Sequence, residues 1–308
     1  MKNTAVAQQN IAQAATKKIA YGVALALAGS IAFSGKAIIV KLAYRYGVDA
    51  VTLIMYRMLM ALPFFLAMAW WSGRGQQALS RSDWLYVLFL GFTGYYVASF
   101  LDFAGLQYIS ASLERLILYL NPTIVMLMGW LLWDKKITRR QMAAFALSYC
   151  GVLLVFGHEA KLEGSDVGLG ALLVFGSAVA YAVYLSYSGQ LVQKLGSLRL
   201  AGLATSVACL FCIAQFAVLR PWAAVHVAPE VLWLSLLNAT VCTVAPVLMV
   251  MMAIERIGAA KTAQVGMVGP MATITLGVLV LDEPFNAWIV AGTALVLSGV
   301  YLVSRSKT

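Results

Sequence analysis

Charged residues are scarce in this sequence. They make up 11% of its 308 residues, whereas 62% are hydrophobic. Soluble domains are typically about 25% charged and about 45–50% apolar, so this chain has too few polar groups to cover a water-facing surface. It is too apolar to remain disordered, and its four cysteines are too few for a disulfide scaffold. The composition excludes an ordinary soluble enzyme and predicts an all-α polytopic membrane protein.

Catalytic and nucleotide-binding signatures are also missing from the sequence. It has no G-x-x-x-x-G-K-[ST] motif, so we expect no direct ATP drive within the chain. It has no H-E-x-x-H or similar paired signature, and its two histidines fall in predicted loops. We therefore expect no enzyme activity, no catalytic residue, no metal site and no cofactor.

Long apolar runs are abundant in the sequence. A membrane-spanning helix needs roughly 20 mostly apolar residues, and ten segments meet this requirement. We place them at residues 19–44, 50–72, 83–107, 112–133, 138–157, 167–190, 198–219, 230–254, 258–281 and 285–304. The short connections leave no room for a soluble domain. Residues 1–18 are interpreted as a polar cytoplasmic leader before an uncleaved first span, because the apolar run that follows is longer than that of a signal peptide.

The basic residues indicate how the spans are oriented. With the N-terminus placed inside, most Lys and Arg residues fall in segments on the inner side of the membrane. The outer segments hold only Arg45, Arg115, Lys161 and Arg220. Cytoplasmic loops collect positive charge, so we expect a multi-pass protein of the cell (inner) membrane with both termini cytoplasmic. This bias accounts for most of the net charge of +10 without a nucleic-acid partner.

The second half of the chain repeats the first. When the sequence is shifted so that Pro122 lies over Pro270, Asp134 falls on Asp282 and the next helix stays aligned without a gap. This repeat shift divides the ten spans into two similar halves of five. Because five is an odd number, the halves must be inverted relative to each other. Inverted repeats are typical of secondary transporters, which bind substrate at the repeat interface.

Each half ends in a proline, a helix rich in small residues, an acidic turn and a helix that closes on Gly-Val-x-Leu. These stretches are NPTIVMLMGWLLWDKKITRRQMAAFALSYCGVLLV and GPMATITLGVLVLDEPFNAWIVAGTALVLSGVYLV. The pattern resembles the EamA domain of the drug/metabolite transporter (DMT) superfamily, which includes bacterial exporters of amino acids and other metabolites. The resemblance implies two EamA-like repeats, at residues 19–157 and 158–308, in an exporter of small metabolites. One departure is the first-half turn, Asp134–Lys135, where the family usually has Glu.

Charged residues inside the spans are the main candidates for a binding site. Each costs about 2.5–3.5 kcal/mol at a helix centre and usually faces a cavity or a partner. We expect Lys36, Arg57 and Asp102 to line a cavity and to bind an anionic or zwitterionic substrate. Asp102 or Glu114 is the candidate for proton coupling. The alternative is that these charges pair with one another and only fix the helix register.

Polar and aromatic residues extend the candidate site. Tyr95, Ser99 and Asp102 have the spacing i, i+4, i+7 and form a stripe on the third span. The other substrate-binding candidates are Tyr119 in the fourth span, Tyr181 and Tyr184 in the sixth, Asn238 in the eighth and Gln264 in the ninth. A pocket charged on one side and aromatic on the other suits an amphipathic metabolite such as an amino acid. Ordinary helix packing is the alternative for Tyr181 and Tyr184.

Two prolines occupy matching places in the fourth and ninth spans. Pro122 and Pro270 each remove a helical hydrogen bond and free the carbonyls of Leu118 and Gly266. Breaks at corresponding positions of two halves point to a binding site or a hinge, so we interpret both prolines as hinges. Small residues on the first span are interpreted as a helix-packing face; these are Ala26, Ser30 and Ser34.

The sequence thus predicts a secondary active or facilitative transporter that works by alternating access. Its partners are a small-molecule substrate and the lipid bilayer. Ten helices suffice to enclose a cavity in one chain, so a monomer is sufficient and a dimer is possible. The alternative is a protein that translocates lipids or phosphorylated metabolites, for which Lys36 and Arg57 would supply a basic head-group site.

Overall fold

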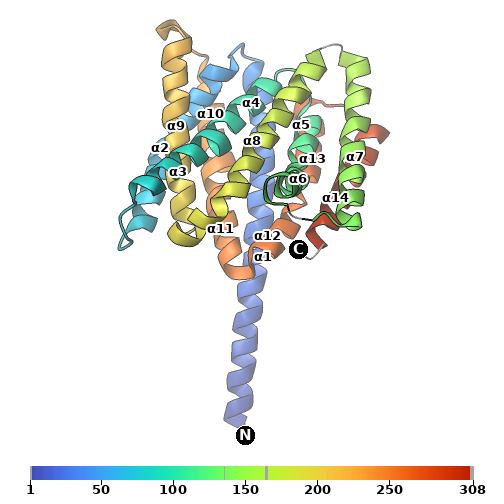
Figure 1. The fold of residues 1–308 in the computed structure, drawn as a ribbon. Helices are drawn as coiled ribbons and strands as arrows, with labels where there is room; N and C mark the ends of the chain where they lie inside the picture. The colour runs from blue at the N-terminus through green and yellow to red at the C-terminus, as the bar shows by residue number, and fades with distance from the viewer. Residues whose placement is uncertain (1, 135, 164–165, 306–308) are drawn as a thin grey trace.

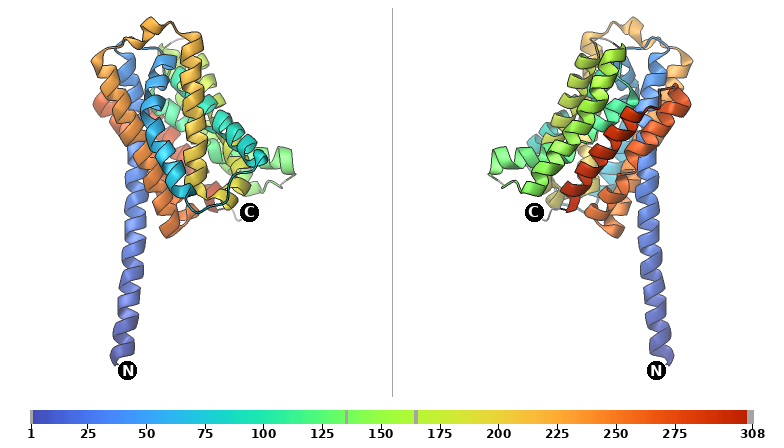
Figure 2. Two further views of the ribbon diagram at one scale, coloured as in Figure 1. Left: turned by 90° about the vertical axis from the view of Figure 1, so that its left-hand side faces the viewer. Right: turned by 90° about the vertical axis from the view of Figure 1, so that its right-hand side faces the viewer.

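All regular secondary structure in the described part of the chain is helical (Figure 1). The structure is a computed structural model that describes residues 2–134, 136–163 and 166–305. Within these ranges, the side chains of residues 2–18, 162–163, 190, 259–260, 263–264 and 303–305 lie outside the description. The helices form one bundle, from which the N-terminal part of α1 protrudes (Figures 1 and 2).

The first half contains α1 (Lys2–Tyr44), α2 (Ala50–Gly73), α3 (Arg81–Leu90), η1 (Gly91–Val97), α4 (Ala98–Gly105), α5 (Ala111–Leu118), α6 (Asn121–Trp133) and α7 (Arg139–Glu163). The second half contains α8 (Asp166–Leu195), α9 (Ser197–Leu219), η2 (Trp222–Val225), α10 (Pro229–Ala239), η3 (Thr240–Val244), α11 (Ala245–Ile257), α12 (Ala259–Gly266), α13 (Gly269–Leu281) and α14 (Ala287–Arg305). The segments η1 and η3 are π-helical and η2 is a short 3₁₀ turn.

The first eight predicted spans correspond to helices long and apolar enough to cross a membrane. In the described residues these are Ile19–Tyr44, Ala50–Gly73, Arg81–Gly105, Ala111–Trp133, Arg139–Lys161, Asp166–Gly189, Ser197–Leu219 and Pro229–Ile257. The last two predictions correspond to shorter apolar helices, Gly269–Leu281 and Ala287–Leu302. The largest difference is at the start, because α1 begins at Lys2 rather than near residue 19. The polar leader is therefore a helical extension of the first span.

The two halves run in opposite directions. In Figure 1, α1 rises through the bundle while its counterpart α8 descends, and α2 descends while α9 rises. The largest contacts join the halves in reciprocal pairs: α2 packs on α9 and α7 on α14, while α1 packs on α11 and α4 on α8. The halves are therefore interleaved across one shared core.

The helices are irregular at matching places in the two halves. The repeat shift superimposes η1 on η3, and it superimposes the break between α5 and α6 on the break between α12 and α13. The α6 and α13 helices both end on a left-handed aspartate, with φ of 49° at Asp134 and 60° at Asp282. Each aspartate N–H bonds back to a glycine carbonyl, of Gly129 and of Gly277. Aspartate tolerates this conformation better than most residues, which explains its presence in both turns.

One turn outside the spans is stabilised by charge. Asp49 caps α2 by accepting hydrogen bonds from the backbone N–H groups of Val51 (2.9 Å) and Thr52 (3.2 Å). It also pairs with Arg220 at the end of α9, at 3.0 Å. Partial burial opposes ionisation of the carboxyl, but the bonds from Thr52 and Arg220 outweigh it and lower the pKa of Asp49 below its usual value. The turn thereby joins the α1–α2 connection to the second half.

Candidate functional site

A buried cluster of charges lies where three elements of the first half meet. Lys36 on α1 is in ion-pair contact with Asp102 on α4, and its Nζ lies 3.3 Å from Glu114 Oε1 on α5. Asp102 is 2% exposed and Glu114 is fully buried. One ammonium group thus serves two carboxylates away from solvent. The sequence analysis gave pairing of these charges with one another as the alternative to lining a cavity. The structure contains this pairing, which brings Lys36, Asp102 and Glu114 together.

Arg57 on α2 connects this region to the second half. Its Nε donates to the hydroxyl of Thr243 at 3.1 Å, and its guanidinium lies 5.1 Å from the centre of the Phe103 ring. The Thr243 hydroxyl in turn donates to the carbonyl oxygen of Asn238 at 2.8 Å. In η3 the π-helical turn leaves this carbonyl available to a side chain, because a π-helix replaces i→i+4 bonding with i→i+5 bonding. The backbone irregularity therefore helps to position Arg57.

Several buried polar atoms of this region have no hydrogen-bond partner among the described residues. They include one donor, Arg57 Nη1, and three kinds of acceptor, Asp102 Oδ1, Asn238 Oδ1 and the oxygens of Glu114. Buried polar atoms are nearly always hydrogen-bonded in folded proteins, and exceptions call for an explanation. A ligand with both an acceptor and donors would satisfy this set.

Three tyrosines form a separate aromatic group. The ring of Tyr95 on η1 packs edge-on against that of Tyr184 on α8 at 5.1 Å, and their hydroxyl oxygens are 3.4 Å apart. Tyr181 stacks on Tyr184 at 5.5 Å. A Cβ atom on Gly94 would collide with the Tyr184 ring, so a glycine in η1 is what lets these helices approach. Tyr95 thus contacts α8 whereas Asp102, on the same predicted stripe, contacts α1.

The break between α12 and α13 is filled by hydroxyl groups. The Gly266 carbonyl that the proline pattern predicts to be free accepts bonds from Tyr119 Oη (2.7 Å) and Ser30 Oγ (2.9 Å). Ser34 Oγ donates to the Gly269 carbonyl at 2.8 Å. Ser30 and Ser34 therefore bond to the broken backbone in addition to packing. The sequence alone predicted only packing for these serines, because it does not show that α1 lies beside the break.

The two prolines lie in the first turns of α6 and α13, just after the breaks. Proline is well tolerated there, because the first turn of a helix has N–H groups without intrahelical partners. On the first-half side, the Leu118 carbonyl accepts the amide of Asn121 at 2.7 Å. Pro122 and Pro270 thus start new half-helices and do not kink continuous ones.

The remaining candidates are less informative. Ser99 on α4 is half-buried, and the side chain of Gln264 on α12 lies outside the described residues. No group of three His, Cys, Asp or Glu side chains that could hold a metal ion was found among the described residues.

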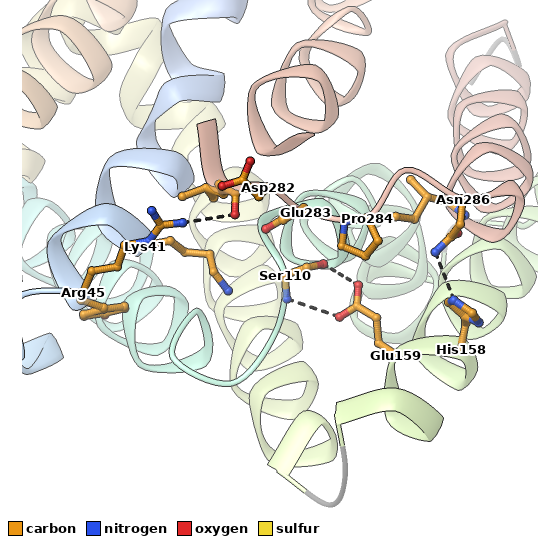
Figure 3. A pocket seen from close by; sticks show the side chains of 12 residues that line it. Lys41, Arg45, Ser110, His158, Glu159, Asp282, Glu283, Pro284 and Asn286 are labelled. Carbon is orange, nitrogen blue, oxygen red and sulfur yellow. Dashed lines mark hydrogen bonds between the residues drawn. The ribbon is translucent and has the colours of Figure 1, made fainter. Parts of the chain in front are cut away.

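A cavity of about 460 Å³ lies at one end of the bundle, apart from the buried cluster (Figure 3). It is lined by Lys41, Tyr44, Arg45, Ser110, His158, Glu159, Leu281, Asp282, Glu283, Pro284, Asn286 and Ile289. Across it, the backbone N–H of Ser110 donates to Glu159 at 3.3 Å, and Asn286 Nδ2 lies 3.1 Å from the His158 ring. None of the substrate-binding candidates is among these lining residues. The sequence analysis missed this cavity, because its walls come from helix ends and connections far apart in the chain.

Comparisons with known proteins place this architecture in a family. Two stretches of the chain, residues 20–157 and 168–305, each match the EamA-like transporter family. The chain belongs to this family. The expected resemblance is thereby confirmed, with one match in each half.

The chain is also similar to proteins of bacteria and archaea. It is 29% identical over 300 residues to YcbK of Bacillus subtilis (strain 168), an uncharacterized transporter, covering 94% of both chains. It is 24% identical over 278 residues to an uncharacterized transporter of Archaeoglobus fulgidus, covering 89% of this chain and 94% of the relative. A crystal structure matches with a TM-score of 0.63 at 15% identity, over 92% of this chain and 98% of the other, which shows a shared fold. The protein is thus a multi-pass membrane protein of a transporter family.

Proposed function

We propose that this protein is a secondary active or facilitative transporter that exports small zwitterionic metabolites, such as amino acids, by alternating access. It would use ten spans arranged as two inverted repeats, residues 19–157 and 158–308, after the leader 1–18. The basic-residue pattern supports an orientation with both termini cytoplasmic in the cell (inner) membrane. A single chain supplies both halves of the site.

The observation that carries this proposal is the set of unpartnered buried atoms around the charged cluster. The free Nη1 of Arg57 suits a carboxylate, which arginine binds strongly. The free oxygens of Asp102 and Asn238 suit an ammonium group. An α-amino acid carries both a carboxylate and an ammonium group, so one small substrate would meet both needs. The group of Tyr95, Tyr181 and Tyr184 would contact its apolar part.

Glu114 is the proposed proton site. It is fully buried, and Lys36, which is within ion-pair distance of it at 3.3 Å, is shared with Asp102. Burying a carboxylate without full compensation is costly, so a neutral form is favoured. A substrate ammonium that competes with Lys36 for Asp102 would change the charge around Glu114. Substrate binding and proton release would thereby be coupled.

The matched helix breaks support movement of the halves. Half-helices that start at Pro122 and Pro270 lie beside the interface, and transporters of inverted-repeat design bind substrate at such discontinuities. Lipid translocation is less well supported. Lys36 already pairs with Asp102, so Lys36 and Arg57 do not form a free basic pair for a phosphate head group.

Counterflow in proteoliposomes tests the proposal. Vesicles are preloaded with pooled amino acids, and the uptake of one labelled solute at a time is measured. Saturable uptake that is stimulated by the internal pool supports the carrier and names its substrate class. Absence of uptake by verified, folded protein contradicts amino acids as substrates and directs the assay to phosphorylated metabolites. Stoichiometric lipid in the purified protein would instead favour the lipid alternative.

A further inference from the structure

A carboxylate from the second half binds the start of a helix in the first half. Glu283, in the connection between α13 and α14, accepts hydrogen bonds from the backbone N–H groups of Ala111 (2.7 Å) and Ser112 (3.3 Å). It also accepts one from the Ser112 hydroxyl at 2.8 Å. These N–H groups begin α5, where the helix dipole favours negative charge. The contact joins the two halves at the end of the bundle that holds the 460 Å³ cavity, which we call the α5 end.

Two basic residues of α1 reinforce this contact. Lys41 Nζ donates to the carbonyl of Ile109, just before α5, at 2.7 Å. Arg45 Nη2 donates to the carbonyl of Leu281, the last residue of α13, at 3.2 Å. A cation is favourable at a helix C-terminus. Figure 3 shows Lys41, Arg45 and Glu283 around the same cavity. We call Glu283, Ser112, Lys41 and Arg45 the latch.

The repeat shift identifies the residues that would form the same contacts at the opposite end. They are Lys135 in place of Glu283, Ala260 in place of Ser112, Gly189 in place of Lys41 and Gln193 in place of Arg45. Alanine and glycine have no polar side chain, and glutamine has no charge. Lysine at the place of Glu283 is positively charged where glutamate is negative, and a cation is unfavourable at a helix N-terminus. The sequence therefore cannot build an equivalent latch there.

We propose that the latch holds the α5 end closed and that the opposite end, which lacks it, opens more readily. Opening the α5 end separates Glu283 from the N–H groups of α5 and Arg45 from the end of α13. Opening the other end breaks none of these latch contacts; the described bonds that join the halves there are from Lys194, a half-exposed lysine, to Asp83 and from Arg199 to the Gln77 carbonyl. This inference rests on the proposed function, in which the halves alternate between two states. In the proposed orientation the α5 end is outer, so the resting transporter faces the cytoplasm.

Distances between spin labels on purified protein in lipid nanodiscs test this bias without a substrate. One pair, Gln107 with Phe285, reports on the α5 end, and a second pair, Arg139 with Glu255, reports on the opposite end; all four side chains are exposed. Cys150, the exposed native cysteine, is replaced by alanine, since the other three are buried. Each pair is measured in separate samples by double electron–electron resonance. The wild-type background is expected to give a short, narrow distribution at Gln107–Phe285 and a broader one at Arg139–Glu255.

Two variants change the latch in opposite ways. Glu283→Ala removes it and should raise the ratio of long to short distances at Gln107–Phe285 by roughly tenfold, within the usual range of such couplings. Lys135→Glu supplies a carboxylate at the sequence position that the repeat shift pairs with Glu283, and should narrow and shorten the Arg139–Glu255 distribution. Asp166→Ala, which removes an exposed carboxylate from the first turn of α8, is the matched control and should change neither distribution.

The latch is contradicted if folded Glu283→Ala protein keeps the wild-type distribution at Gln107–Phe285. It is equally contradicted if Lys135→Glu leaves the Arg139–Glu255 distance distribution unchanged. This second variant tests the latch even if Glu283→Ala protein fails to fold. The proposed function fails independently, by an absence of counterflow. Distances that shift as expected in a protein without counterflow would keep the latch and remove the transport proposal.

Discussion

The two halves share a backbone plan but differ in side-chain chemistry. Both contain a π-helical segment, a broken helix and a left-handed aspartate at matching places. The charged residues of the candidate site belong to the first half: the repeat shift puts Tyr184 at the place of Lys36, Thr205 at Arg57, Val250 at Asp102 and Thr262 at Glu114. Shared backbone irregularities give the halves similar ways to move, whereas unequal side chains give the interface one charged and one neutral wall. In the proposed transporter, the repeat would preserve the parts that move, while the first half would supply the charged contacts to the substrate.

The strongest test of this comparison removes the charge that serves both carboxylates. Lys36→Met leaves Asp102 and Glu114 buried without a counter-ion, and breaking a buried pair in this way costs about 3–5 kcal/mol. We expect a large fall in the thermal unfolding temperature in detergent and loss of counterflow. Adding Asp102→Asn should recover much of the stability, because it removes one of the stranded charges.

A lysine–aspartate pair with a half-exposed lysine supplies the control for that test. Lys194 and Asp83 pair at 2.7 Å; the lysine side chain is 54% exposed, whereas the Asp83 side chain is 8% exposed and also accepts hydrogen bonds from Ser80 N and Oγ. Exposed pairs contribute about 0–1 kcal/mol, so Lys194→Met should change the unfolding temperature little. Equal effects of Lys36→Met and Lys194→Met would contradict a special role for the buried cluster.

The next test concerns the break between α12 and α13 in the second half. A Cβ atom on Gly269 would lie 2.6 Å from Tyr119 Oη and 2.9 Å from Arg115 Nη2, whereas at Gly266 the nearest atom is Ser30 Oγ at 3.9 Å. Overpacking costs typically about 1–3 kcal/mol, so Gly269→Ala should lower the unfolding temperature and slow counterflow. Gly266→Ala, in the same break, should change both much less. Similar counterflow rates for Gly269→Ala and Gly266→Ala would show that close packing at Gly269 is not needed for transport.

A smaller effect on transport is expected at Thr243 in η3, whose hydroxyl accepts a hydrogen bond from Arg57. Thr243→Val removes the hydroxyl that accepts from Arg57 and donates to Asn238, leaving buried groups unsatisfied at a cost of about 1–3 kcal/mol. Counterflow should fall several-fold through a raised KM, because Arg57 loses its orientation. Thr240→Val removes a hydroxyl from the same segment that bonds only locally, to Leu236 at 2.7 Å, and is the matched control. A Thr243→Val protein with unchanged KM would exclude Arg57 positioning by η3.

The smallest effect is expected at the Asp49–Arg220 pair, which joins the halves outside the spans. Both side chains are over a third exposed, so Arg220→Ala should cost under about 1 kcal/mol at pH 7. The pKa of Asp49 is lower in the folded protein than in the unfolded chain. The pair therefore stabilises the folded state at pH values above the pKa of the unfolded chain, and this stabilisation is lost as the pH falls through the pKa of the folded protein. The gap in unfolding temperature between wild type and Arg220→Ala should therefore close below about pH 4. A gap that widens in acid would assign the effect to another group.

Much of the fold was predictable from hydropathy. Apolar runs located the first eight spans to within a few residues, and the matched Pro122 and Pro270 indicated the repeat, because both signals are local. The π-helical segments were not predictable, since one inserted residue scarcely alters an apolar pattern. Lys36, Asp102 and Glu114 could be chosen as candidates from their cost in a membrane. Their shared contact could not be derived, because it depends on how α1, α4 and α5 pack.

Counterflow by Arg57→Ala and Asp102→Asn protein beside wild type tests the central claim most directly. Both variants are reconstituted at equal, verified amounts of folded protein, with Lys194→Met as a control. The account predicts saturable uptake by wild type and the control, and loss of uptake in both variants, because the substrate would lose one of its two charged partners. Unchanged uptake in both variants would contradict the charged wall of the first half as the binding site.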